Sequence, residues 1–250
     1  MKKFSHALSR TTVALAFVGG GLVSAAGAQQ PTAPQPAAAR AAAPSLKRPV
    51  SPSKAPDADG FLQRWLLLEP MKVPGQLTES AVQAAVKLAQ GVDDARGTVA
   101  EKDLVRVPKD GDVVTIGGES LVWHAVDTLA YNVNLFHFAY ALNKPTSNVL
   151  FWAVTTVESP RDLSGVRLAI GSNAASIWYL NGVEVIHLYN DRQAVIDDGV
   201  SRRVTLKKGP NVIRAAIVNA GGATDFCARF LDEHDTPITG LTVTLGTNAK

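Results

Sequence analysis

The chain has 250 residues, of which 46% are hydrophobic and 19% charged, and its formal net charge is +3. Residues 1–28 hold Lys2, Lys3 and Arg10 and no acidic residue, so the remainder balances 22 basic against 22 acidic side chains. A balanced charge gives no electrostatic support for nucleic acid or an anionic membrane as a partner.

Residues 1–28 have the pattern of an export signal. Basic residues precede an apolar stretch from Thr12 to Val23, and Ala26-Gly27-Ala28 offers the small side chains that signal peptidase requires. The alternative is an uncleaved membrane anchor, but the apolar stretch is short and rich in glycine for a span. We therefore expect cleavage after Ala28, no membrane insertion after cleavage, and a periplasmic or extracellular location.

Residues 29–56 have the composition of a tether. Seven prolines lie among many alanines, with few large apolar side chains. Such a segment buries too little surface to offset the entropy of ordering, and its prolines favour extended chain. We expect a disordered linker over 29–56 and one folded domain over 57–246, which is long enough for a substantial core.

The folded part alternates short apolar stretches with turn residues. Strands are predicted at 61–68, 113–116, 121–126, 135–142, 149–157, 166–170, 204–206, 212–218, 226–231 and 241–245. Asn181-Gly182 joins two further apolar stretches, and this pair favours the two positive φ angles of a type I′ hairpin turn. The pattern predicts an all-β, antiparallel sandwich.

One segment has helical rather than alternating spacing. Val82, Ala85, Val86 and Ala89 recur within residues 79–90, and Thr78 is a suitable N-cap. We expect one inserted surface helix, packed on one of the two sheets.

The sequence offers no recognisable catalytic residues. It has no Gly-x-Ser-x-Gly string for a hydrolase nucleophile, and its acidic residues cluster in turns rather than as a facing pair. His124, His137, His187 and His234 lack the spacing of zinc ligands. Cys227 is the sole cysteine and is expected to be a buried, inert thiol. The prediction is therefore a protein that is not an enzyme.

Several motifs, in order, resemble the galactose-binding-like jelly-roll domains that accompany secreted bacterial glycoside hydrolases and acetylxylan-esterase-type proteins. Arg64–Pro70 resembles the opening W-L-x-L-G-P strand of that family, and Ile177–Gly182 resembles its V-x-V-W-L-N-G hairpin. Further similar passages are Leu121–Trp123 with Tyr131–Leu135, Arg167–Asn173, Val204–Asn211 and Phe226–Phe230. The resemblance implies a jelly-roll sandwich and glycan recognition. Asn173-Ala174 departs from it, because relatives carry two aspartates there.

The sequence offers a weak candidate for the ligand site and another for a metal. Tyr189, Asn190, Asp191 and Arg192 follow the hairpin and combine an aromatic face with planar polar groups, as glycan sites do; alternatively Tyr189 only covers the sandwich edge. The resemblance implies a possible structural calcium ion, for which Asp191, Asp197 and Asp198 are the candidate ligands. Trp65, Trp123 and Trp152 are assigned to the core, and Trp178 to the core or to stacking on the hairpin.

The leading functional hypothesis is an exported, non-catalytic module that binds carbohydrate. The alternative is a structural or protein-interaction module of the cell envelope, with an envelope protein as the partner. An esterase or glycosidase is the third and weakest hypothesis.

Overall fold

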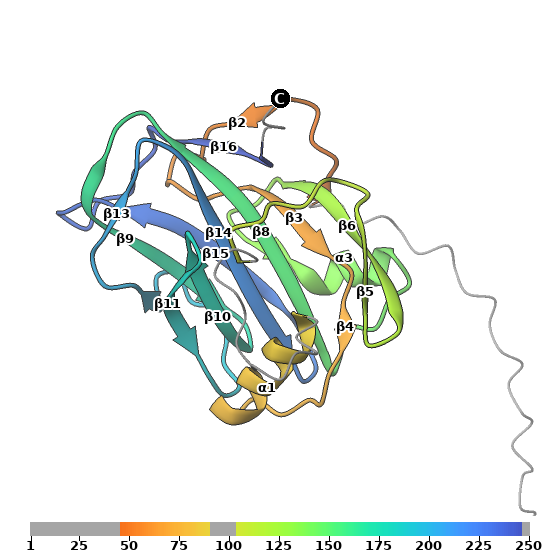
Figure 1. Ribbon diagram of the computed structural model, residues 1–250. Coiled ribbons are helices and arrows are strands. Elements are labelled where there is room, and N and C mark those ends of the chain that lie inside the picture. Colours follow the sequence, from red (N-terminus) through yellow and green to blue (C-terminus); the bar gives the residue numbers. More distant parts are fainter. Residues whose placement is uncertain (1–45, 91–103, 247–250) are drawn as a thin grey trace, which may run out of the picture. The chain divides into compact units, whose positions relative to one another are not determined.

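The computed structural model describes residues 46–90 and 104–246, which belong to one compact unit, Ala39–Lys250. The expected signal and residues 29–45 of the expected linker lie outside the described part. Two antiparallel β-sheets pack face to face (Figure 1), which confirms the predicted all-β sandwich.

The larger sheet has β3, β8, β14 and β10 at its centre. Its main strand order is β1 (Leu46–Lys47), β6 (Glu119–Thr128), β3 (Arg64–Leu68), β8 (Val149–Ser159), β14 (Gly209–Asn219), β10 (Ala175–Leu180) and β11 (Val183–Leu188). Four short strands join it at the sides: β2 (Ser53–Lys54), β4 (Met71–Lys72), β5 (Val113–Ile116) and β16 (Thr242–Thr244).

The smaller sheet is built on β9 and β15. Its order is β12 (Gly199–Val200), β9 (Leu163–Ser172), β15 (Asp225–Leu231) and β7 (Val133–Asn134), and β13 (Val204–Leu206) also pairs with β9. The chain passes from one sheet to the other between β8 and β9, between β9 and β10, and again on either side of β15. Repeated crossing between two sheets is the jelly-roll type of connection.

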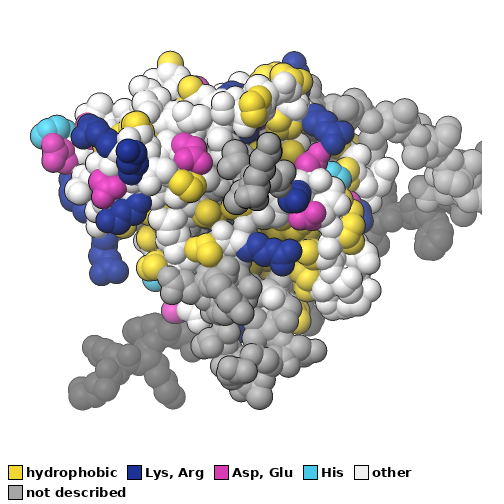
Figure 2. All heavy atoms as spheres, turned by 45° about the horizontal axis from the view of Figure 1, so that its top comes forward, with side chains coloured by type: hydrophobic (Ala, Val, Ile, Leu, Met, Phe, Trp, Pro, Cys, Tyr) yellow, Lys and Arg dark blue, Asp and Glu magenta, His cyan; other side chains and the backbone are white. Residues whose placement is uncertain are grey.

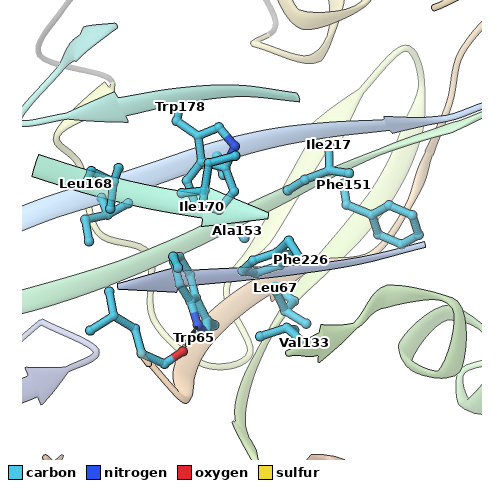
Figure 3. Packing of buried hydrophobic residues seen from close by; sticks show 14 of the residues in the cluster. Trp65, Leu67, Val133, Phe151, Ala153, Leu168, Ile170, Trp178, Ile217 and Phe226 are labelled. Carbon is cyan, nitrogen blue, oxygen red and sulfur yellow. Dashed lines mark hydrogen bonds between the residues drawn. The ribbon is translucent and has the colours of Figure 1, made fainter. Parts of the chain in front are cut away.

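The core between the sheets centres on three aromatic rings. Trp65 of β3 and Trp178 of β10 meet Phe226 of β15 edge to face, with ring centroids 4.9 and 5.5 Å from that of Phe226 (Figure 3). Both indole N–H groups are satisfied inside the core: Trp65 donates to the Leu62 carbonyl at 2.7 Å and Trp178 to the Ser176 hydroxyl at 3.0 Å. Large aromatic rings with satisfied polar edges fix the spacing of the two sheets.

The other face of the larger sheet is also covered. A second buried cluster joins its strands to helix α1 (Glu79–Ala89) and to residues 104–116, which include β5. Figure 1 shows α1 lying against this outer face. Nearly every residue of β8 is buried, because one set of side chains faces the smaller sheet and the alternate set faces this cover.

The predicted hairpin turn is confirmed. Asn181 and Gly182 have φ angles of +51° and +84°, as a type I′ turn requires. The Asn181 side chain accepts from the Val212 amide at 2.8 Å and donates to Asn211 at 3.0 Å, so the turn is tied to the neighbouring strand β14.

Residues 135–142 were expected to be a strand and are instead helical, as α3 (Leu135–Ala141). Asn134 caps the helix by accepting from the His137 amide at 2.7 Å. The buried residues are Leu135, Phe138 and Ala139, which follow helical rather than alternating spacing. The alternating aromatic residues misled the strand prediction, and the sandwich has more than one helix.

Part of the expected linker belongs to the sandwich. Strands β1 and β2 come from residues assigned to the tether, and they pair with β6 and β16. Arg64 explains why this segment is held: it binds both carboxylate oxygens of Asp127 at 2.8 Å and donates to the Ser51 carbonyl at 2.9 Å. A buried guanidinium must be fully paired, and the backbone of Ser51 completes its pairing.

Replacing Trp65 by alanine removes one ring of the three-ring core and leaves a cavity. We expect the free energy of unfolding to fall by about 3–5 kcal/mol, as for other buried aromatic truncations. Equilibrium denaturation in urea measures this, and Val183→Ala, at a side chain that is 56% exposed, is the control with a change within about 0.5 kcal/mol. A Trp65→Ala protein as stable as the control contradicts the assigned core.

Candidate functional site

Two of the four side chains predicted to bind glycan, those of Tyr189 and Arg192, are engaged with other parts of the protein, and Asn190 and Asp191 are exposed. Tyr189 stacks on His187 with ring centroids 5.0 Å apart, and its hydroxyl accepts from Gln83 of α1 at 3.3 Å. Arg192 forms an ion pair with Asp198, and the backbone N–H of Asn190 donates to the Leu77 carbonyl at 2.8 Å. These contacts tie the segment after β11 to the start of α1 and leave Tyr189 half-buried, as the edge-covering alternative predicted.

The three candidate calcium ligands do not converge. Asp197 binds Arg229 through both carboxylate oxygens, Asp198 pairs with Arg192, and Asp191 is exposed. Across residues 46–90 and 104–246, no three His, Cys, Asp or Glu side chains gather closely enough to hold a metal ion. The arginine partners supply the charge balance that a cation would otherwise provide.

Among the hollows of the described part of the sandwich, two are considered as sites. One, of about 430 Å³, is lined by residues of β1, β6 and α3 and by Asp110. Two of its polar side chains are already paired: His124 contacts Glu69 at 3.4 Å, and Asp110 accepts from the Ala125 amide at 2.9 Å. Burial opposes ionisation of Glu69, but hydrogen bonds from Lys144 and the Val122 amide outweigh it and lower the pKa of Glu69. The charged groups beside this hollow, Glu69 and Lys144, therefore pair with each other, and His124 contacts the same carboxylate.

The other hollow, which we call the Trp pocket, has a volume of about 420 Å³ and lies between the larger sheet and its cover. The sheet contributes Leu68, Trp123, Trp152 and Arg214 from β3, β6, β8 and β14. The cover contributes Ala89, Gln90, Leu104, Arg106, Pro108, Asp112, Val113, Val114, Thr115 and Ile116. A volume of this size is typical of small-molecule sites, which span about 300–1,000 Å³.

The sheet side of the Trp pocket is an aromatic and cationic surface. The Arg214 guanidinium carbon lies 5.9 Å from the Trp123 ring centroid and 5.4 Å from that of Trp152. Arg214 also donates to the Leu104 carbonyl at 3.1 Å and to the Arg106 carbonyl at 2.5 Å, which fastens the covering segment to β14. The guanidinium is thus positioned both by the indole rings and by the backbone of the cover.

Gln90 is a lining residue of this pocket whose side-chain amide is buried without a partner. It follows the last residue of α1, and its backbone N–H donates to the Val86 and Lys87 carbonyls. Its side-chain nitrogen and oxygen are both buried and neither makes a hydrogen bond. A buried amide without partners costs free energy, so this group is suited to a ligand that supplies both a donor and an acceptor.

Sequence reasoning assigned Trp123 and Trp152 to the core, and they are 4% and 3% exposed. It missed that both also line a cavity, because the strand pattern does not reveal the cover on the outer face. Gln90 was recognised only as the end of a helix. One sequence signal could have indicated the pocket. Trp123 and Trp152 lie on strands whose alternate, inward-facing positions are already largely apolar, so the two tryptophans must lie on the outer face of the sheet and need a cover there.

Charge on the face of the molecule seen in Figure 2 does not favour one sign of partner. Figure 2 shows basic and acidic side chains interspersed over the visible face rather than gathered into a patch. No helix within the described ranges is both long and apolar enough to cross a bilayer.

No protein-family profile and no curated protein matches the chain. Solved structures that match include a PA14 sugar-binding domain from an RTX adhesin, with 10% identity, 72% of this chain and 96% of that domain covered, and a TM-score of 0.39. An anti-sigma factor domain-containing protein matches with 10% identity, 47% of this chain and 40% of its own covered, and a TM-score of 0.37. A beta-glucosidase from Kluyveromyces marxianus matches with 20% identity, 44% of this chain and 14% of its own covered, and a TM-score of 0.32.

The chain thus spans about two fifths of the length of the anti-sigma factor protein and about one seventh of the beta-glucosidase. At these TM-scores, the case for a ligand depends on the residues of the Trp pocket.

Cys227 lies on β15 and is 3% exposed, as the sequence predicted. Burial raises the pKa of its thiol to about 11, although a hydrogen bond with the Gly171 backbone opposes the shift. The thiolate that reacts with electrophiles is therefore scarce at neutral pH.

We expect Cys227 to resist a thiol-specific reagent such as dithionitrobenzoate at pH 8 in the folded protein and to react fully in guanidinium chloride. Since the folded pKa is raised above the unfolded value of 9.0, the thiol's contribution to stability is complete below pH 9 and is lost towards pH 11. Absorbance at pH 8 checks the first point, and urea unfolding of the wild type and Cys227→Ala across this range checks the second. Rapid labelling without denaturant contradicts the burial.

Proposed function

We propose that the chain is an exported, non-catalytic carbohydrate-recognition module whose glycan site is the Trp pocket. The observation that carries the proposal is one cavity that combines two indole rings, a fixed guanidinium and a buried, unpaired amide. Sugars present C–H faces that pack on aromatic rings and hydroxyls that pair with planar polar side chains. The cavity holds both kinds of group side by side.

The proposal moves the glycan site from the segment Tyr189–Arg192, which contacts the start of α1, to the pocket at the C-terminal end of that helix. In the former segment Tyr189 and Arg192 are engaged within the protein, whereas both atoms of the Gln90 amide lack a partner. A rigid sheet supplies the aromatic side chains, which limits the entropy lost when a sugar binds.

The residues that line the Trp pocket favour binding without catalysis. Asp112 is the one carboxylate among the described lining residues, and it accepts from the Lys109 amide at 2.8 Å. Hydrolysis of a glycosidic bond by the usual mechanism requires two carboxyl groups that flank it. A single, engaged aspartate supports recognition instead.

Filling the pocket tests the proposal. Val113 lines the pocket and is 62% exposed, so Val113→Trp adds bulk there with little disturbance of the core. Binding on a glycan array and retention on insoluble polysaccharides should fall at least tenfold. Val183→Trp is the matched control, because Val183 is similarly exposed on β11 and lies outside the pocket.

The opposite results would overturn the proposal. Absence of binding to every glycan by correctly folded protein removes it, as does binding that survives Val113→Trp unchanged. A stable envelope-protein partner retained equally by both tryptophan variants supports the protein-interaction alternative.

A further inference from the structure

We propose that the Trp pocket recognises an acetamido sugar and that Gln90 is the residue that determines this specificity. This inference rests on the proposed function and names the class of sugar. It follows from which polar groups of the pocket are already engaged and which one is not.

Most polar groups around the pocket have partners within the protein. The Trp152 indole N–H donates to the Ala89 carbonyl at 3.3 Å, and Arg214 donates to two backbone carbonyls of the cover. Asp112 accepts from a backbone amide. A sugar that enters meets these engaged groups as surfaces for packing, whereas the exposed side chains of Arg106 and Thr115, which also line the pocket, can pair with its outer hydroxyls.

The Gln90 amide is the exception. Its nitrogen and oxygen are both buried without a partner, so a matching ligand needs one acceptor and one donor close together. A 2-acetamido sugar has both: its acetyl carbonyl accepts from Nε2, and the hydroxyl on the neighbouring ring carbon donates to Oε1. Two adjacent hydroxyls would meet the same requirement, so the walls of the pocket must decide between them.

One part of the pocket wall is apolar. Ala89 precedes Gln90 on α1, and Leu68, Leu104 and Ile116 line the same cavity with Trp152. At the ring carbon that differs, a plain hexose places a hydroxyl, which would lose water against these apolar residues without gaining a partner from them. The acetyl methyl group instead buries apolar surface, which is favourable. The pocket therefore fits one polar pair attached to an apolar group, which describes an acetamido substituent.

The absence of an internal partner also predicts how the free protein behaves. Replacing Gln90 by leucine removes two unsatisfied polar atoms at nearly constant volume, which relieves their desolvation cost. We expect Gln90→Leu to unfold at a higher urea concentration than the wild type while it binds the sugar more weakly. Replacement of a residue that only supported the fold would lower stability, so it would not combine higher stability with weaker sugar binding.

Three β-1,4-linked trisaccharides that differ at one ring carbon test the specificity. They are the trimers of N-acetylglucosamine, glucosamine and glucose, titrated into the purified protein by calorimetry. The acetylated trimer should bind at least tenfold more tightly than the other two. Gln90→Leu should weaken its binding roughly ten- to a hundredfold and leave the glucose trimer nearly unchanged.

The matched control is Gln83→Leu. Gln83 lies on the same helix, is exposed, and contacts Glu79 and Tyr189 rather than the pocket, so its loss should leave all three affinities unchanged. Equal affinity for the acetylated and glucose trimers overturns this inference, and so does a preference that persists in Gln90→Leu.

Failure of the inference is separable from failure of the proposed function. Binding of other glycans that Val113→Trp abolishes, without any preference for acetamido groups, overturns the inference and leaves the proposed function in place. Binding of no glycan by folded protein overturns both.

Discussion

Burial of the larger sheet on both faces is the constraint on which the rest of the structure depends. The inner face packs against the smaller sheet through Trp65, Trp178 and Phe226, and the outer face packs against α1 and residues 104–116. A sandwich needs only the inner contact to fold. The outer cover therefore adds a second apolar layer, and the Trp pocket exists because the cover and the sheet do not fill all the space between them.

Arg214 links that cover to the sheet in a way that apolar packing alone would not. Its guanidinium lies over Trp123 and Trp152 and donates to two backbone carbonyls of the segment that crosses the sheet. The carbonyls gain charged donors and the arginine gains satisfied hydrogen bonds, so each offsets the other's desolvation. The same contacts hold the pocket open at a defined width.

The sequence predicted the sandwich well because alternation, turn residues and the Asn181-Gly182 pair are local signals. It failed at α3, where Phe136, Phe138 and Tyr140 satisfy a strand pattern while Leu135, Phe138 and Ala139 satisfy a helical one, and the Asn134 cap decided the outcome. The Trp pocket was beyond local signals. It depends on which strands lie side by side, and β6, β8 and β14 bring Trp123, Trp152 and Arg214 together from distant parts of the chain.

The attachment of residues 46–54 has a mechanical consequence. Strand β1 pairs with β6 over only two residues, whereas Ser51 is held by Arg64, which is itself bound to Asp127. A pulling force applied before Leu46 would first separate β1 from β6. It would then act on the charged clamp, in which Arg64 binds both Asp127 and the Ser51 carbonyl. The sandwich beyond the clamp, which includes the Trp pocket, is therefore expected to stay intact when β1 separates from β6.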